Sequence, residues 1–239
     1  MTTEDTSSDG NIDEAVITFV LDESGSMGHM EHAAREAFNE FLQEQINHGG
    51  RTWWTLVTFN SQTSVRFEHI PGAEVRPLKV GDYRPSAMTA LYDALGDAIT
   101  ATQKRLVKRE DNGNPSDVIV VVMTDGMENA SLRWTHQRVF DLITECEQAG
   151  WQFIFLGANQ DSWSVADRLG MHKAAVADFS ADRAAAMRSM DDANYAARSY
   201  RTSKAQQEFY SDHRGKSRYE YDEKRRQRRD RDTSDKPKR

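Results

Sequence analysis

The sequence has few of the residues and motifs on which several common kinds of site depend. Cys146 is its only cysteine, so no intrachain disulfide can form and no cysteine-based zinc site is available. The phosphate-binding motif G-x-x-x-x-G-K-[ST], the dinucleotide motif G-x-G-x-x-G and the zinc motif H-E-x-x-H are also missing. These absences argue against a P-loop NTPase, a dinucleotide-binding enzyme and a zinc protease of that type.

Long apolar runs are missing too. No stretch reaches the roughly eighteen apolar residues that a membrane-spanning helix requires. The first twelve residues are polar and acidic, without the basic start and apolar core of a signal peptide. We therefore expect no membrane interaction and a cytoplasmic location.

Charge is distributed unevenly along the chain. Residues 201–239 carry fourteen Lys and Arg against eight Asp and Glu, a net charge of +6. The whole chain has a net charge of −7, so residues 1–200 have a net charge of −13. Apolar residues make up 38% of the 239 positions, which is enough for one sizeable domain with terminal extensions. We expect four parts: a flexible arm over 1–12, a domain over 13–180, a helix over 181–201 and a basic, disordered tail over 202–239.

Short apolar runs and helical spacing alternate through the domain. The runs 15–21, 118–124 and 152–156 are rich in β-branched and aromatic residues and predict strands covered on both faces. Apolar residues at helical spacing predict four helices, over 29–47, 91–107, 135–148 and about 161–169. This alternation predicts a mostly parallel, doubly wound α/β sheet with helices on both faces.

Two local features complete the predicted fold. Residues 52–59 and 64–69 flank a short polar turn, which predicts a hairpin and therefore one antiparallel edge strand. Trp53 and Trp54 would lie on opposite faces of the first of these strands, each packed against helices. The helix near the C-terminus would pack through Ala185, Met187 and Met190.

The run 15–21 leads directly into a loop with oxygen-bearing side chains at alternate positions, Asp22, Ser24 and Ser26. Open α/β sheets bind their ligands at the carboxyl ends of the strands, where this loop lies. One carboxylate and two hydroxyls at this spacing can surround a small cation, and Mg²⁺ prefers such oxygen ligands. The same loop could also simply turn the chain and cap the next helix.

Two more segments end at the same predicted edge. Asp125 follows the strand 118–124, and Thr89 comes just before the helix 91–107. Alone, the Asp125-Gly126 step would be an ordinary turn, and Thr89 an ordinary helix cap.

Together these three segments make the chain resemble the von Willebrand factor A family, over roughly residues 13–180, with a complete metal-ion-dependent adhesion site. The resemblance implies direct metal binding by Ser24 and Ser26, binding by Asp22 and Asp125 directly or through water, and binding by Thr89 when a ligand is engaged. It also implies Mg²⁺ as the metal, with Mn²⁺ or Ca²⁺ as substitutes.

The same resemblance implies a function. The chain would be a binding module with no enzymatic activity, serving in adhesion or as a scaffold or adaptor in a bacterial or phage multi-component system. The partner would be a protein that completes the metal's coordination with an Asp or Glu carboxylate.

Other readings of the chain remain open. A Mg²⁺-dependent phosphoryl-transfer enzyme would also use Asp22 and Asp125, although Ser24 stands where one such enzyme class has a second Asp. The basic stretch 224–231 could contact nucleic acid, although acidic residues interrupt it. His29 and His32 form only H-x-x-H, a weak zinc pattern.

Overall fold

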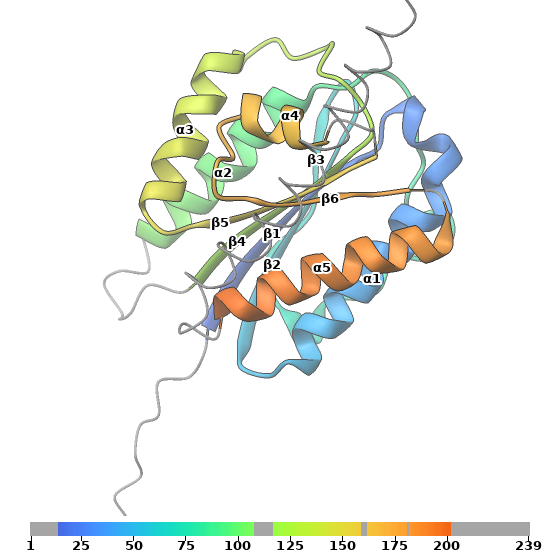
Figure 1. The fold of residues 1–239 in the computed structure, drawn as a ribbon, viewed down its shortest axis with the longest axis vertical. Helices are drawn as coiled ribbons and strands as arrows, with labels where there is room; N and C mark the ends of the chain where they lie inside the picture. The colour runs from blue at the N-terminus through green and yellow to red at the C-terminus, as the bar shows by residue number, and fades with distance from the viewer. Residues whose placement is uncertain (1–13, 108–116, 159–161, 181, 202–239) are drawn as a thin grey trace, which may run out of the picture.

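The computed structural model describes residues 14–107, 117–158, 162–180 and 182–201. These residues form a six-stranded sheet in the order β3-β2-β1-β4-β5-β6, in which only the β2–β3 pair is antiparallel (Figure 1). The strands are β1 (Glu14–Asp22), β2 (Arg51–Phe59), β3 (Thr63–Pro71), β4 (Asp117–Thr124), β5 (Gln152–Gly157) and β6 (Ala175–Asp178). The predicted fold class, including one antiparallel edge strand, is confirmed.

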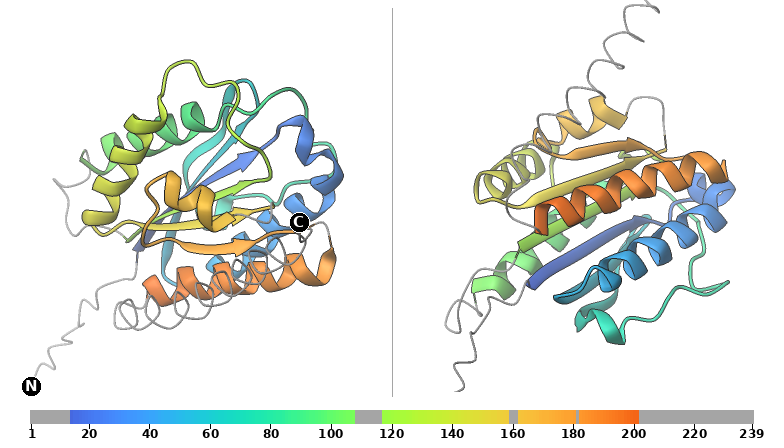
Figure 2. Two further views of the ribbon diagram at one scale, coloured as in Figure 1. Left: turned by 45° about the horizontal axis from the view of Figure 1, so that its top comes forward. Right: turned by 60° about the horizontal axis from the view of Figure 1, so that its bottom comes forward.

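Helices cover both faces of this sheet (Figures 1 and 2). One face carries α1 (Glu31–Asn47), preceded by the 3-10 helix η1 (Gly25–Met30), and α5 (Arg183–Arg201). The other face carries α2 (Leu91–Val107), α3 (His136–Gln148) and α4 (Ser162–Arg168). A short 3-10 helix, η2 (Gly72–Glu74), follows β3.

The two layers result from the alternation of side chains along the central strands. In β1, Phe19 packs in the core beneath α1 and α5, whereas its neighbour Val20 packs in the core beneath α2 and α3. The first core is rich in aromatic rings: Phe38 and Phe41 of α1 meet Phe19 and Trp54 edge to face, with ring centres 5.2 to 6.3 Å apart.

Three features differ from the sequence-based expectations. Strand β6 was not predicted, because its four residues are Ala-rich and only partly buried at the edge of the sheet. Met187 points outward and is 48% exposed, and the buried methionine of α5 is Met190. Trp53 is only half-buried and stacks on His69 of β3, whereas Trp54 is fully buried and packs against Phe38 and Phe41 of α1.

Helix α5 is joined to the end of α1 by a buried arginine. Arg201 is 4% exposed and donates hydrogen bonds to the backbone carbonyls of Gln45, at 3.0 Å, and of Gly49. These carbonyls lie at the negative end of the α1 dipole, which favours a cation. The last turn of α5 is therefore an integral part of the fold.

The predicted arm over 1–12 and the predicted tail over 202–239, including 224–231, lie outside the described residues. Within the part of the chain that the structure covers, no helix is long and apolar enough to cross a membrane.

Candidate metal centre

The loop that follows β1 is shaped by Asp22, the last residue of that strand. Asp22 is fully buried, and its Oδ1 accepts a hydrogen bond from the backbone N–H of Ser24 at 2.7 Å. Ser24 immediately precedes η1, yet its side chain makes no capping hydrogen bond. Its hydroxyl instead lies 3.0 Å from that of Ser26. The simple capping role considered for this loop is therefore not the one that Ser24 plays.

Strand β4 is hydrogen-bonded to β1 and brings a second carboxylate to the same edge. Ser26 donates from its hydroxyl to Oδ1 of Asp125 at 2.7 Å, although the two residues are 99 positions apart. Thr124, the last residue of β4, donates to Oδ2 of Asp22 at 2.5 Å. Two neighbouring parallel strands thus end in one polar cluster.

Thr89 approaches this cluster from the loop before α2. The helix begins at Leu91, so the residue next to its start is Ala90 and Thr89 is not the cap. A Cβ atom added to Gly126 would lie 2.9 Å from Oγ1 of Thr89 and 3.4 Å from Oδ2 of Asp22. The Thr89 hydroxyl and the Asp22 carboxylate therefore both lie next to Gly126. A larger residue at position 126 would come too close to the Thr89 hydroxyl.

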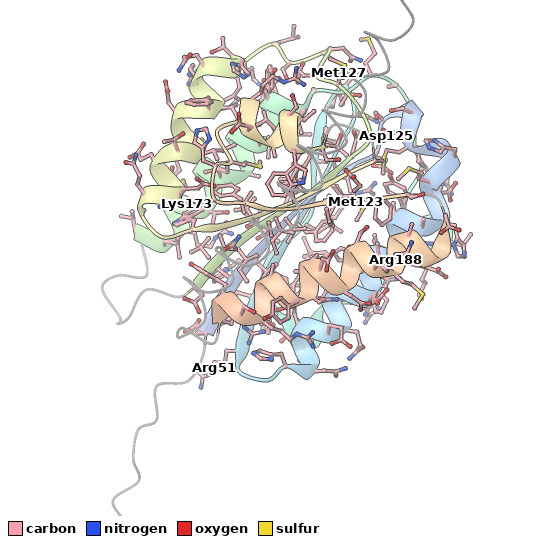
Figure 3. All side chains as sticks on the ribbon, viewed as in Figure 1. Arg51, Met123, Asp125, Met127, Lys173 and Arg188 are labelled. Carbon is pink, nitrogen blue, oxygen red and sulfur yellow. The ribbon has the colours of Figure 1, made fainter. Side chains whose placement is uncertain are left out.

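All five predicted residues consequently meet at one edge of the sheet. We call this group the candidate metal site: Asp22, Ser24, Ser26, Thr89 and Asp125. Four of its members are at most 8% exposed, and only Ser26 is open to solvent. Figure 3 shows Asp125 on the segment that leaves β4.

The electrostatics of this group are unfavourable without a cation. Burial raises the pKa of Asp22 above its ordinary value, hydrogen bonds from Thr124 and Ser24 oppose this, and the nearby charge of Asp125 adds to it. None of these influences on Asp22 within the described residues is a positive charge. Two carboxylates close together in a buried place are stabilised when a divalent ion shares them.

Further residues hold the first loop in place. Tyr83 is buried and donates from its hydroxyl to the backbone carbonyl of Asp22 at 2.5 Å. Arg66 of β3 donates to both carboxylate oxygens of Glu23, at 2.8 and 3.0 Å. Glu23 also accepts from the backbone N–H of Arg84 on its side chain and from that of Ser86 on its carbonyl. The loop before Thr89 is thus tied to the loop that contains Ser24.

The segment after Asp125 is tied to Thr89 in a similar way. Asn129 accepts on its Oδ1 from the backbone N–H of Thr89 at 2.9 Å and donates its own N–H to the carbonyl of Thr89 at 3.0 Å. Thr124 could have been noticed as a polar residue at a strand end. The roles of Asn129 and Arg66 have no local signal, because their partners are far away in sequence.

The donor set fits a hard cation. It contains two carboxylates and three hydroxyls, all of them oxygen ligands of the kind that Mg²⁺ takes. Among the described residues, no group of three or more His, Cys, Asp or Glu is placed to hold a metal ion. Nδ1 of His29 is hydrogen-bonded to the backbone carbonyl of Ser26, and Nε2 of His32 lies 3.2 Å from Oε1 of Glu36. The H-x-x-H zinc reading therefore has no third ligand in that part of the chain.

Fold and site together define a class of protein: an open α/β domain with a candidate cation site at the carboxyl ends of its central strands. The chain belongs to the von Willebrand factor type A domain family, whose model matches residues 17–193. Domains of this family are commonly adhesion or protein-interaction modules and often bind a divalent metal. No curated protein matches the chain.

Solved structures share the fold at low sequence identity. A von Willebrand factor type A protein from Catenulispora acidiphila has a TM-score of 0.53 at 14% identity, over 78% of this chain and 43% of that one. Manganese-loaded TRAP from Plasmodium vivax has a TM-score of 0.50 at 17% identity, over 70% of this chain and 69% of that one. The pilus adhesin SpaC from Lactobacillus rhamnosus GG has a TM-score of 0.56 at 15% identity, over 80% of this chain and 30% of that one. This chain thus spans less than half the length of the first and third of these proteins.

Proposed function

We propose that this chain is a Mg²⁺-dependent protein-binding module, whose metal is held by the candidate metal site and completed by a carboxylate of a partner protein. The observation that supports this most directly is the convergence of two buried carboxylates with three hydroxyls, one of them on an exposed residue. Ser26 lies at the open side, where a partner can approach.

The residues divide the work by charge and position. Asp22 and Asp125 supply two negative charges, and Ser24, Ser26 and Thr89 supply neutral oxygens, so these five ligands would leave the sixth octahedral position of a divalent ion to attract a carboxylate oxygen. When bound, the metal would supply that attraction and one exchangeable coordination position. Mn²⁺ or Ca²⁺ could take its place.

Calorimetry on the full chain tests the site. We expect the Asp22→Ala/Asp125→Ala variant to lose most of its Mg²⁺ or Mn²⁺ binding, because both negative ligands are gone. The matched control, Asp141→Ala/Asp191→Ala, removes two exposed carboxylates from α3 and α5 and should bind metal like the wild type. Equal metal affinity in wild type and the Asp22/Asp125 variant would show that the site is assigned wrongly.

Two assays address the remaining parts of the proposal. The absence of turnover of a generic phosphate ester in Mg²⁺ is expected of a binding module, whereas turnover would favour the phosphoryl-transfer reading. A pull-down with and without EDTA identifies a metal-dependent partner, and with it the bacterial or phage system that we propose. Cell fractionation tests the proposed cytoplasmic location.

A further inference from the structure

Large apolar side chains are exposed on the two segments that carry Thr89 and Asp125. Met88 is 57% exposed, Met127 is 71% exposed and Leu132 is 93% exposed. We call these three residues the apolar rim. Single exposed apolar residues are common on proteins, so their positions relative to one another decide whether they form a surface.

The apolar rim lies on two segments that touch. Met88 directly precedes Thr89, and Met127 follows Gly126, where an added Cβ atom would lie 2.9 Å from Oγ1 of Thr89. The paired hydrogen bonds between Thr89 and Asn129 join the two segments. Figure 3 shows Asp125 and Met127 on the same segment beyond β4.

The backbone at the apolar rim is held in place by side chains. The N–H of Met88 donates to the hydroxyl of Ser61 at 3.1 Å, and the N–H of Leu132 donates to Asp93 of α2 at 3.1 Å. The backbone at Met88 and at Leu132 is therefore held by hydrogen bonds to side chains of other segments. Flexible methionine side chains can adapt to apolar partners of different shape, which suits a binding surface.

We infer that the partner carboxylate bound at the candidate metal site is flanked by apolar side chains, which pack on Met88, Met127 and Leu132. This inference rests on the proposed function. An acidic side chain in apolar surroundings fits both halves of the surface, because the metal attracts the charge and the apolar rim excludes water around it. A lower local polarity strengthens the attraction between carboxylate and metal.

Two monocarboxylates that differ in apolar surface provide the test. Acetate and 4-methylpentanoate are titrated into the full chain in saturating Mg²⁺, and binding is followed by NMR of ¹³C-labelled methionine methyl groups. We expect 4-methylpentanoate to bind roughly tenfold more tightly, the ratio that corresponds to burying about two methylene groups. The methyl signals of Met88 and Met127 should shift with it.

Variants separate the apolar rim from the rest of the surface. Met88→Ser/Met127→Ser should lose most of the preference for 4-methylpentanoate while keeping the affinity for acetate. Val107→Ser is the matched control, because Val107 is 65% exposed at the far end of α2, about 24 Å from its start. This control should keep the preference. Thermal melts confirm that each variant is folded.

The outcomes distinguish the two proposals. Equal, Mg²⁺-dependent binding of both carboxylates would leave the metal site in place and overturn the apolar rim. Binding of neither carboxylate, with no metal binding by calorimetry, would overturn the proposed function and this inference with it. Binding of the uncharged 4-methylpentanamide in EDTA as strong as that of 4-methylpentanoate in Mg²⁺ would also overturn the inference, because the apolar surface would then act without the metal.

Discussion

The carboxylate of Asp22 is closed off from solvent and accepts hydrogen bonds from Thr124 and Ser24. Its pKa in the folded protein is raised by burial. Any stability that this group contributes is therefore present below its ordinary pKa and is lost as the pH rises through the raised value. Without a metal, burial therefore disfavours the ionised form of Asp22 relative to the protonated form.

We accordingly predict that Asp22→Asn raises the melting temperature in EDTA and removes the further rise that Mg²⁺ causes in the wild type. Asparagine can still accept from Ser24 N–H, and the Thr124 hydroxyl can turn to the carbonyl of Gly126, 3.3 Å away. The gain in EDTA should be on the order of 1 kcal/mol. Thermal melts at pH 7 with Mg²⁺ and with EDTA measure both effects.

The control for this prediction is Asp141→Asn on the exposed side of α3, which should behave as the wild type in both buffers. A persistent Mg²⁺-induced rise in Asp22→Asn would contradict the assignment of Asp22 as a ligand.

Thr89 supplies a hydroxyl whose importance we place in the bound state. Thr89→Ala should weaken carboxylate binding far more than it weakens the fold, because the backbone bonds to Asn129 remain and only the hydroxyl and the γ-methyl group are lost. The stability cost should be about 1 kcal/mol. Acetate affinity at fixed Mg²⁺ measures the effect on carboxylate binding. Thermal melts with and without EDTA measure the effect on the stability of the fold. Unchanged affinity with a lowered melting temperature would leave Thr89 a structural residue.

At the scale of elements, the start of α2 holds the segment that follows Asp125. Asp93 accepts hydrogen bonds from the backbone N–H groups of Leu132, Arg133 and Trp134, at 2.8 to 3.1 Å. Burial acts to raise its pKa, but these three donors and the charge of Arg133 outweigh it, so the pKa of Asp93 lies below its ordinary value. Asp93 thus stabilises the segment between Asp125 and α3 as an anion.

This arrangement predicts a pH-dependent effect of Asp93→Asn. Because the pKa of Asp93 is lowered in the folded protein, its carboxylate stabilises the fold at pH values above its ordinary pKa of 3.8. This stability is lost as the pH falls through the pKa that Asp93 has in the folded protein. The variant should lose about 2 kcal/mol at pH 7, and the difference from the wild type should shrink toward pH 3. Urea unfolding at several pH values measures it, and a difference independent of pH would refute the ionic role.

At the scale of the whole molecule, α5 is the last described element that contributes to the core beneath α1. We predict that a chain ending at Arg201 melts within about 2 °C of the full chain, since a change below roughly 0.5 kcal/mol corresponds to that shift. Arg201→Ala in the full chain is the contrasting variant. It removes the bonds to Gln45 and Gly49 and should lower the melting temperature clearly. Loss of several degrees on truncation would show that residues beyond 201 contribute to the fold.

The sequence by itself determined the elements whose burial is encoded in local spacing. The runs that became β1, β4 and β5 are apolar over their whole length, and α1 to α3 repeat apolar residues at helical spacing, so each could be predicted within one or two residues. The positions of Asp22 and Asp125 followed in turn, because the carboxyl ends of parallel strands share one edge.

Only the tertiary structure decided which distant side chains meet. The bonds of Arg66 to Glu23, of Thr124 to Asp22 and of Asn129 to Thr89 join residues on separate elements, and no periodic pattern records such pairs. Met187 was predicted inward and points outward because its orientation depends on how α5 is rotated against α1. Local spacing specifies whether a segment is buried, whereas partners and direction are set by the packing of whole elements against one another.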